Sequence, residues 1–271
     1  MRIATFNVNS IRARKERVLS WLGRHSVEIV CLQELKVEDT GFPCDEIEAL
    51  GYHAAWHGQK TYNGVAILSR APLTDVSVAM DDRVEDSHAR LIAATTCGVR
   101  VISAYFPNGG TLDSEKYVYK LEWMRRLREE LARSLQTHAL PHVLAGDFNV
   151  APFADDVARP NEFEGGVLAS AEVRAALEAI AGLGLIDVFR PFHPQGGVYT
   201  WWDYRGGGFE RGNGLRIDHI LASPSLAETC VGAIVDREER EGEAPFDHAP
   251  VVADFDWPCE LSAPVRPPPT A

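Results

Sequence analysis

The chain has 271 residues, of which 45% are hydrophobic and 24% are charged, a balance typical of a globular protein that can build a sizeable core. No apolar run reaches the length of a membrane span, and the N-terminus lacks the charged and apolar regions of a secretory signal. The net charge of −12 disfavours a dedicated nucleic-acid binder, because neutralisation of phosphates by basic residues supplies much of the affinity of such proteins. Basic residues nevertheless cluster at 12–17 and 205–216, so a nucleic-acid partner stays open.

Short apolar or alternating runs predict strands, and apolar residues at helical spacing predict helices. Strands are predicted at 2–8, 28–32, 52–56, 64–69, 89–96, 99–106, 142–146, 215–222 and 248–255. Helices are predicted at 12–25, 43–50, 113–136 and 170–181, and residues 153–166 are expected to be irregular. The strands outnumber the helices that could cross between them, which favours two packed sheets with helices outside over a doubly wound parallel sheet.

The cysteines and the C-terminal residues bear on compartment and domain organisation. The five cysteines are scattered and odd in number, and no pair has the spacing of a metal knuckle, so we expect reduced thiols in a cytoplasmic protein. Neither a linker nor a repeat interrupts residues 1–257, which we expect to form a single domain. Residues 258–271 hold five prolines and are expected to be a disordered tail.

The stretch 142–152 carries the first chemical signal. A buried strand is expected to end at Gly146, where glycine permits a turn or a close approach of the backbone. Asp147 and Asn149 follow two residues apart, which places both side chains on one side of an extended chain. A carboxylate beside a carboxamide suits a phosphoryl group, since one can activate a nucleophile or hold a metal while the other donates a hydrogen bond. An Asx-type turn that closes the strand explains these two residues equally well.

Polar side chains follow several other predicted strands. In a layered α/β protein such strand ends converge on one crevice, where ligands bind. Glu34 directly follows an apolar run, so its carboxylate is expected to be partly buried and to need a partner or a metal. Each position alone is more simply explained as a turn or edge residue, and only the set indicates a site. Its members are Asn7, Glu34, Tyr105, Asp147, Asn149, Asp218, Asp247 and His248.

These residues lie in motifs that occur in order along the chain: Phe-Asn-Val-Asn-Ser-Ile-Arg at 6–12, Leu-Gln-Glu-Leu-Lys at 32–36, Gly-Val-Ala at 64–66, Gly-Asp-Phe-Asn-Val-Ala-Pro at 146–152, Tyr-Thr-Trp-Trp-Asp-Tyr at 199–204, Leu-Arg-Ile-Asp at 215–218 and Asp-His-Ala-Pro at 247–250. The series resembles the exonuclease III family of class II apurinic/apyrimidinic endonucleases, within the DNase I-like phosphoesterase superfamily. The resemblance implies an α/β fold, a four-layered α/β sandwich in which two packed mixed β-sheets are flanked by helices. Residues 1–257 would then form one endonuclease/exonuclease/phosphatase domain.

The resemblance also implies an activity. The enzyme would hydrolyse the phosphodiester 5′ to abasic sites by in-line attack of an activated water. It would also act as a 3′-to-5′ exonuclease and repair blocked or recessed 3′ ends of double-stranded DNA. Its cofactor would be Mg²⁺, with Mn²⁺ able to substitute, and the protein would act as a monomer in the cytoplasm, associated with the nucleoid through DNA.

Residue roles follow from the resemblance and from chemistry. Glu34 would bind Mg²⁺, which prefers carboxylate oxygens. Asn7 would support this site, either as a ligand through its amide oxygen or by a hydrogen bond to a ligand. Asp147 or His248 would act as the base, and Asp218 would fix the tautomer of His248. The expected catalytic residues are Tyr105, Asp147, Asn149, Asp218 and His248. The expected metal-site residues are Asn7, Glu34, Asp147, Asn149, Asp247 and His248.

A second set of residues is expected to contact DNA. Trp201 and Leu215 match family positions that pack around a flipped-out abasic sugar, a pocket that fits a sugar without a base. Because neighbours on a strand face opposite ways, we expect only one of Trp201 and Trp202 at this pocket and the other in the core. Arg12, Arg90 and Arg216 are candidate phosphate contacts, although each could equally be an ordinary ion-pair partner.

Two other functions are compatible with parts of this pattern. A phosphatase or phosphodiesterase of the same superfamily acting on non-DNA substrates would share Glu34, Asp147, Asn149 and His248, but should lack the aromatic and glycine-rich segment between residues 199 and 215. A DNA-binding homologue with a weak or inactive site would have lost at least one of the polar residues, and all of the expected ones are present.

Overall fold

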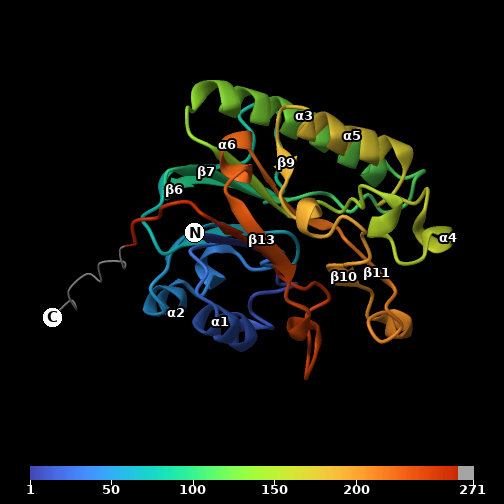
Figure 1. The fold of residues 1–271 in the computed structure, drawn as a ribbon, viewed down its shortest axis with the longest axis horizontal. Coiled ribbons are helices and arrows are strands. Elements are labelled where there is room, and N and C mark those ends of the chain that lie inside the picture. Colours follow the sequence, from blue (N-terminus) through green and yellow to red (C-terminus); the bar gives the residue numbers. More distant parts are fainter. Residues whose placement is uncertain (262–271) are drawn as a thin grey trace.

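Two six-stranded mixed sheets pack face to face in the computed structural model, which describes residues 1–261 (Figure 1). The first sheet runs β13 (Cys230–Val235), β14 (Val251–Phe255), β1 (Arg2–Asn7), β2 (Ile29–Gln33), β4 (Val65–Ser69), β3 (His53–His57). The second runs β5 (Thr74–Val78), β6 (Leu91–Thr96), β7 (Val99–Tyr105), β8 (His142–Asp147), β12 (Asp218–Ala222), β9 (Ile186–Asp187). A separate two-stranded ribbon pairs β10 (Trp201–Trp202) with β11 (Gly214–Leu215).

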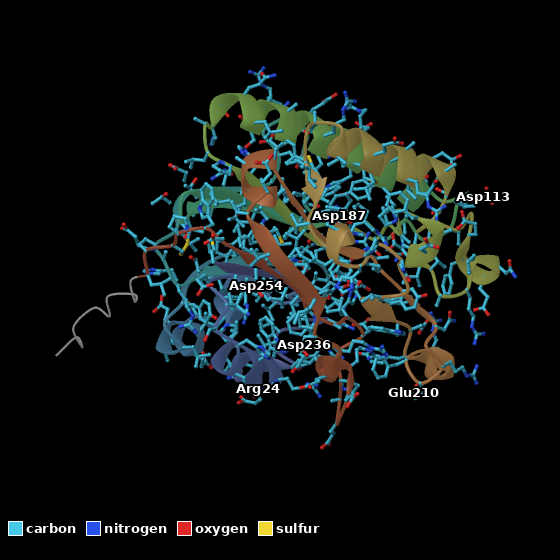
Figure 2. All side chains as sticks on the ribbon, in the orientation of Figure 1. Arg24, Asp113, Asp187, Glu210, Asp236 and Asp254 are labelled. Atoms are coloured by element: carbon cyan, nitrogen blue, oxygen red, sulfur yellow. A yellow bond between two sulfur atoms is a disulfide. The ribbon has the colours of Figure 1, made fainter. Side chains whose placement is uncertain are left out.

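Helices cover the outer face of each sheet, which makes four layers and confirms the predicted fold class (Figure 1). On the first sheet lie α1 (Lys15–Arg24) and α2 (Cys44–Ala49), and on the second α3 (Glu115–Thr137) and α5 (Ala171–Ala181). Shorter elements are α4 (Pro160–Phe163) and α6 (Pro224–Ala227), and the 3₁₀ turns η1 (Asp39–Gly41), η2 (Ala154–Asp156), η3 (Arg190–Phe192), η4 (Arg205–Gly207) and η5 (Arg237–Arg240). Charged side chains such as Arg24 and Glu210 lie at the outer surface (Figure 2).

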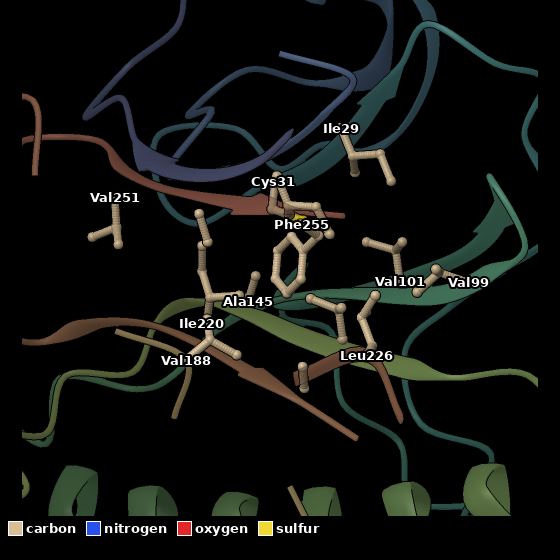
Figure 3. Close-up of a cluster of buried hydrophobic side chains, with 14 of the residues drawn as sticks. Ile29, Cys31, Val99, Val101, Ala145, Val188, Ile220, Leu226, Val251 and Phe255 are labelled. Atoms are coloured by element: carbon tan, nitrogen blue, oxygen red, sulfur yellow. The ribbon is translucent and has the colours of Figure 1, made fainter. Parts of the chain in front are cut away.

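The alternation of side chains along each strand builds the layers. In β2, Ile29 and Cys31 face the other sheet, whereas Val30 and Leu32 face the helices, because successive side chains point to opposite faces. The central cluster therefore fills the space between the sheets with β-branched and small side chains (Figure 3). Burying both faces of these strands excludes water from the layers, and this hydrophobic burial stabilises the fold.

Two parallel pairs fix where the site forms. β1 runs parallel to β2, and β7 runs parallel to β8. A parallel pair needs a crossover, which α1 supplies in the first sheet and α3 in the second. The carboxyl ends of these four strands come together, since the side chain of Asn7 at the end of β1 bonds Asp147 at the end of β8.

The prediction that all the cysteines are reduced is wrong, because Cys97 and Cys259 form a disulfide with their Cα atoms 4.6 Å apart. Cys97 lies in the turn between β6 and β7, and the segment after β14 crosses this turn, where the Trp257 indole donates to the Cys97 carbonyl at 3.1 Å. The two cysteines are 162 residues apart in sequence, so their spacing carried no signal. The predicted tail at 258–271 therefore begins with a tethered segment, and its residues 262–271 lie outside the described part of the chain.

Most predicted elements form, with shifted ends. The helix predicted at 12–25 begins at Lys15, and the strand predicted at 215–222 is divided into β11 and β12. The division occurs because the Thr200 hydroxyl accepts hydrogen bonds from the backbone N–H groups of Ile217 and Asp218. β5 and β13 were not predicted: every residue of β5 is exposed, and a bulge interrupts the alternation of β13. Within residues 1–261 no helix combines the length and apolarity that crossing a membrane requires.

Candidate active site

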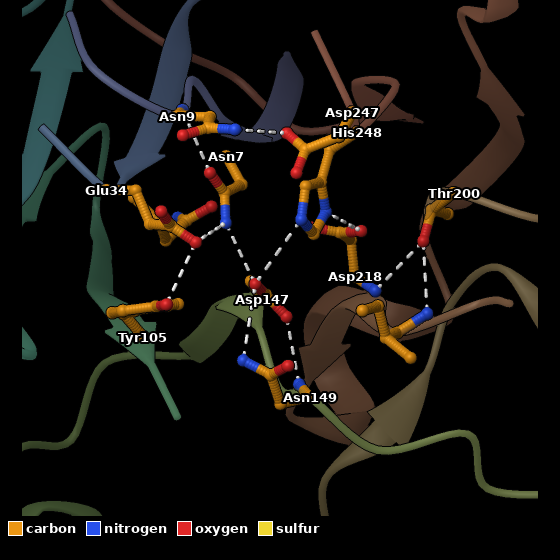
Figure 4. Close-up of polar contacts among 12 residues, drawn as sticks. Asn7, Asn9, Glu34, Tyr105, Asp147, Asn149, Thr200, Asp218, Asp247 and His248 are labelled. Carbon is orange, nitrogen blue, oxygen red and sulfur yellow. Dashed lines mark hydrogen bonds and ion pairs between the residues drawn. The ribbon is translucent and has the colours of Figure 1, made fainter. Parts of the chain in front are cut away.

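Polar residues from both sheets meet at the carboxyl ends of the parallel strands (Figure 4). Asn7 ends β1 and its amide donates to Glu34 Oε1 and to Asp147 Oδ2, each at 2.9 Å. The Tyr105 hydroxyl at the end of β7 donates to Glu34 Oε1, also at 2.9 Å. The site therefore lies between the sheets, and Asn7 connects the carboxylate of one sheet with that of the other.

The turn after β8 holds Asp147 and Asn149. A Cβ atom at Gly146 would lie 1.8 Å from the Ala104 carbonyl oxygen, so only glycine permits this approach of β8 to β7. Asn149 has a φ of +51°, and its backbone N–H donates to Asp147 Oδ1 at 2.9 Å. The Asx-type turn is therefore confirmed, and because this turn faces the polar cluster it is compatible with a role at a phosphoryl group as well. The buried Lys120 secures the turn by donating to the Asn149 carbonyl at 2.7 Å.

A strained turn presents Glu34. Glu34 and Lys36 each have a φ of +54°, a conformation that costs energy for residues other than glycine. Backbone hydrogen bonds hold it, from Ser10 to the Glu34 carbonyl at 2.8 Å and from Lys36 to the Asn63 carbonyl at 2.9 Å. A Cβ atom at Gly64 would lie 2.8 Å from the Cβ atom of the intervening buried Leu35, so the neighbouring loop also requires glycine. Glu34 and Lys36 thus point the same way, toward the cluster.

The partners of Glu34 keep it ionised. Lys36 Nζ lies 2.6 Å from Glu34 Oε2, while Asn7 and Tyr105 bond the other oxygen. Burial opposes ionisation, but the charge of Lys36 and the hydrogen bonds from Asn7 and Lys36 offset it, so the pKa of Glu34 lies below its ordinary value. The Tyr105 hydroxyl is a neutral donor, because burial and the charges of Glu34 and Asp147 raise the pKa of Tyr105 well above its ordinary value.

His248 lies between two buried carboxylates. Its Nδ1 is 2.9 Å from Asp218 Oδ2, and its Nε2 is 3.7 Å from Asp147 Oδ2. Burial lowers the pKa of His248, but the charges of Asp218 and Asp147 outweigh this and raise it well above its ordinary value. Burial also raises the pKa of Asp147, and although His248 opposes this rise, the negative charges of Asp218 and Glu34 add to it. His248 is therefore a cation that forms an ion pair with Asp147, and a hydrogen bond to Asp218 holds the ring in place.

The acidic residues could hold a divalent cation. One ligand atom each of Glu34, Asp147 and His248 lies within 4.8 Å of the others, and the two carboxylates offer the hard oxygen donors that Mg²⁺ prefers. A protonated His248 has no free lone pair on its ring and fits a role as hydrogen-bond donor better than as ligand. Asn7 turns its amide N–H groups to the acids and its oxygen to the Asn9 N–H, which fits a supporting role.

The remaining members of the predicted metal set lie at the edge of this cluster. Asp247 is half-buried, and its Oδ1 accepts a hydrogen bond from the Asn9 amide at 2.9 Å. The Asn149 amide donates to the Phe106 carbonyl at 3.0 Å and approaches Asp147 Oδ2 at 3.4 Å. Both face the site, although neither belongs to the group of closely spaced ligand atoms.

The predicted DNA-contacting residues are placed differently from one another. Trp201 is half-buried, with its ring centroid 6.5 Å from that of His248, whereas Trp202 is buried, so the division between surface and core is as predicted. Leu215 pairs with Trp201 across the ribbon but is fully buried, so the prediction that its side chain contacts the sugar is wrong. Arg90 lies over the Tyr105 ring at 4.9 Å, beside a cavity that Glu34 also lines. Arg12 is exposed in the turn before α1.

Arg216 is buried like Leu215, and its prediction as a phosphate contact is also wrong. Its side chain is 1% exposed and forms ion pairs with Asp156 at 2.7 Å and Asp187 at 2.8 Å. A guanidinium held by two carboxylates behind the ribbon cannot reach a DNA backbone. Its sequence position among surface arginines gave no sign of this, since burial depends on η2 and β9, which lie far away in the chain.

Sequence reasoning missed four residues that support the site. Lys36 and Asn9 bond each other at 2.6 Å and contact Glu34 and Asp247 respectively. Both stand two residues after a predicted member, Glu34 or Asn7, and this spacing could have indicated them. Thr200 and Lys120 bond only backbone groups, Thr200 in the Asp218 segment and Lys120 at three carbonyls that include that of Asn149, and nothing in the sequence marks such contacts.

Comparisons with known proteins agree with this fold. The model of the Endonuclease/Exonuclease/phosphatase family matches residues 4–257. Exodeoxyribonuclease III of Haemophilus influenzae is 34% identical over 267 residues, which cover 94% of this chain and 100% of the relative. A 3′ phosphatase from Neisseria, solved with a product DNA hairpin, has a TM-score of 0.92 and 44% identity over 95% of this chain and 100% of its own. An AP endonuclease from Archaeoglobus fulgidus has a TM-score of 0.90 and 44% identity, over 94% and 99%.

Proposed function

The chain belongs to the Endonuclease/Exonuclease/phosphatase family and is a hydrolytic nuclease of DNA repair, and from this premise we propose that it is a Mg²⁺-dependent enzyme that cleaves the phosphodiester 5′ to abasic sites and trims 3′ ends. The observation that carries the proposal is the meeting of Glu34, Asp147 and His248 within 4.8 Å, beside the half-buried Trp201. The carboxylates can hold a cation, the imidazolium can donate a hydrogen bond to a phosphate oxygen, and the indole can form the wall of a sugar pocket.

In this function Asp147 takes the proton of the attacking water. A raised pKa gives the carboxylate the basicity that proton transfer requires near neutral pH. His248, already protonated by its two carboxylate neighbours, donates to a non-bridging oxygen, and the Asn149 amide donates to another. When bound, the divalent ion would neutralise charge on the phosphate and leaving oxygen, with Glu34 as the carboxylate that holds it.

Tyr105 and Asp218 act on these groups. The neutral Tyr105 hydroxyl orients Glu34 and can turn to the leaving group, since it lies on the side of the site opposite His248 (Figure 4). Asp218 fixes the imidazole through Nδ1 and leaves Nε2 directed at the phosphate. Thr200 positions the Asp218 backbone, so the ribbon and the catalytic pair are mechanically linked.

The ribbon supports selection of an abasic site. Trp201 faces His248, and its strand pairs with that of the buried Leu215, which holds the indole in place. The indole then forms a wall suited to a sugar without a base. Extruding such a nucleotide also costs less, because no base must be unstacked. Arg90 and Arg12 are proposed phosphate contacts. A superfamily phosphatase for non-DNA substrates would have no use for this ribbon, which is why we do not favour that function.

We further propose that residues 1–257 act as one domain, and that the protein works as a cytoplasmic monomer on double-stranded DNA. The match of the family model to residues 4–257 supports the first point. The disulfide between Cys97 and Cys259 disfavours the cytoplasm, because such bonds are rare in a reducing compartment.

The experiment compares three substrates with the purified protein. A duplex with one abasic analogue should be nicked in Mg²⁺ and spared with a chelator, and Mn²⁺ should replace Mg²⁺. A recessed 3′ end carrying a phosphate should be processed as well, an activity that the Neisseria 3′ phosphatase makes worth testing. If inositol phosphates are hydrolysed while both duplexes stay intact, the proposal fails.

A further inference from the structure

Lys36 places a positive charge on the carboxylate that we assign to the divalent cation. Its Nζ lies 2.6 Å from Glu34 Oε2 and 2.6 Å from Asn9 Oδ1. Asn9 also contacts the opposite side of the site, because its amide N–H group donates to Asp247 Oδ1 at 2.9 Å. The Lys36 ammonium on one side and the Asp247 carboxylate on the other therefore fix the orientation of the Asn9 amide.

Both oxygens of Glu34 are in use. Oε1 accepts from Asn7 and Tyr105, and Oε2 accepts from Lys36. Asn7 and Tyr105 are neutral donors whose bonds survive when a cation arrives at the carboxylate. The ammonium of Lys36 is a like charge, so it must move away from a divalent ion held by Glu34.

A cavity beside Glu34 can accommodate the displaced ammonium of Lys36. Lys36 and Glu34 line a cavity of about 540 Å³, on the side of Glu34 that also holds Arg90 and Tyr62. The Lys36 side chain is 25% exposed, so its ammonium can turn into the cavity without unfolding the turn. Asn9 Oδ1 gives it a second anchor near the edge of the site. Three cationic side chains line this cavity, Lys36, Arg90 and Lys116, against the carboxylates of Glu34 and Glu115, and such a cluster of cations suits a DNA phosphate.

We propose that Lys36 is the resident counter-cation of Glu34, that it competes with the divalent ion for this carboxylate, and that the displaced ammonium binds a phosphate of the DNA. This inference rests on the proposed function for its DNA part, but not for its metal part. Lys36 thereby couples the two ligands: the ion releases the lysine from Glu34, and the released lysine strengthens the grip on the substrate.

A purely structural role for the Lys36 side chain is disfavoured by the backbone contacts. The Lys36 N–H donates to the Asn63 carbonyl at 2.9 Å, and the Leu35 N–H donates to the Gly64 carbonyl at 3.2 Å. These bonds hold the turn without the ammonium. Lys36→Met keeps the aliphatic stem and removes only the charge, so the variant should fold.

The test measures Mn²⁺ affinity by electron paramagnetic resonance in the absence of DNA. Lys36→Met should bind Mn²⁺ about threefold to tenfold more tightly than the wild type, since a like charge near the ion is gone. Lys36→Arg keeps the charge and should stay near the wild type. Lys15→Met is the matched control, because Lys15 forms a surface ion pair with Glu46 at 2.7 Å and should leave Mn²⁺ affinity unchanged.

The second readout is KM for the abasic duplex at saturating Mn²⁺. Lys36→Met should raise KM several-fold, and Lys36→Arg should restore most of it. Unchanged or weaker Mn²⁺ binding in a folded Lys36→Met would overturn the competition, and an unchanged KM would overturn the phosphate contact. Because the Mn²⁺ titration needs no substrate, a failure of the proposed nuclease function would be seen separately, as absence of nicking by the wild type.

Discussion

Asp218→Asn tests the electrostatic core of the site with a change of one atom. The Asn side chain keeps the shape of Asp218 and removes its charge, which lies 2.9 Å from His248 Nδ1. Two unit charges whose centres are about 4 Å apart interact by roughly 4 kcal/mol at an effective dielectric constant of 20. We therefore expect the variant to lose about 2–4 kcal/mol of stabilisation of the imidazolium, which lowers the cleavage rate by roughly 30-fold to 10³-fold at a pH where the wild-type imidazole is protonated and that of the variant is not.

The same change moves the pH dependence in a defined direction. Asp218 is the largest contribution that raises the pKa of His248, so Asp218→Asn should bring that pKa back toward its ordinary value near 6.5. If the protonated imidazole is the active form, the variant loses activity as pH rises through this lower pKa, whereas the wild type keeps its activity to higher pH.

The assay is single-turnover nicking of a duplex with one abasic analogue, from pH 5.5 to 9.5, alongside an NMR titration of the imidazole. Asp254→Asn is the matched control, because Asp254 forms an ion pair with Arg2 on the surface and should cleave like the wild type. An Asp218→Asn enzyme that cleaves within threefold of the wild type, with the His248 titration unmoved, would refute the reasoning.

Three further predictions follow from other parts of the structure. Trp201→Ala should lower kcat/KM for the abasic duplex about 10-fold to 100-fold while a 3′-phosphate substrate loses less. Burial lowers the pKa of His219 to about 4, so between pH 6.5 and 4 this imidazole is protonated in the unfolded chain but not in the folded one. The folded state should therefore lose about 3 kcal/mol of stability as pH falls through this range, and thermal melts of His219→Gln should show a smaller loss. Cys259→Ser, or reduction of the wild type with dithiothreitol, should lower the free energy of unfolding by about 2–5 kcal/mol in denaturant titrations without slowing cleavage. Unchanged melts of His219→Gln would contradict the role of His219, and an unchanged denaturant midpoint would contradict the role of the disulfide.

The sequence was sufficient wherever a residue's neighbours along the chain decide its environment. The alternation of Ile29 to Leu32 predicts a strand buried on both sides, and the pair Trp201 and Trp202 predicts one inward and one outward ring. The polar residues after β1, β2, β7 and β8 could be gathered into one site because parallel strands end at one edge.

The sequence failed where distant contacts decide. Arg216 looks like a surface cation until Asp156 and Asp187 fold over it, and Cys97 looks free until Cys259 reaches the turn between β6 and β7. β5 was missed although Val76 and Val78 alternate with polar residues, because an alternation this short does not by itself mark a strand, and both valines are exposed. Lys36 was missed for a different reason: its spacing of two residues from Glu34 could have indicated it, but its contact with Glu34 depends on a left-handed turn that the residue types alone do not encode.

The central claim is that acids from both sheets and one imidazole hydrolyse a phosphodiester at a single cation site. Asp147→Asn tests it most directly, in a cleavage and binding measurement on the abasic duplex with Mg²⁺ and with chelator. The account predicts that the wild type cuts only with Mg²⁺, and that Asp147→Asn binds the duplex with comparable affinity but does not cut it. Cleavage by Asp147→Asn at the wild-type rate, or Mg²⁺-independent cleavage by the wild type, would contradict it.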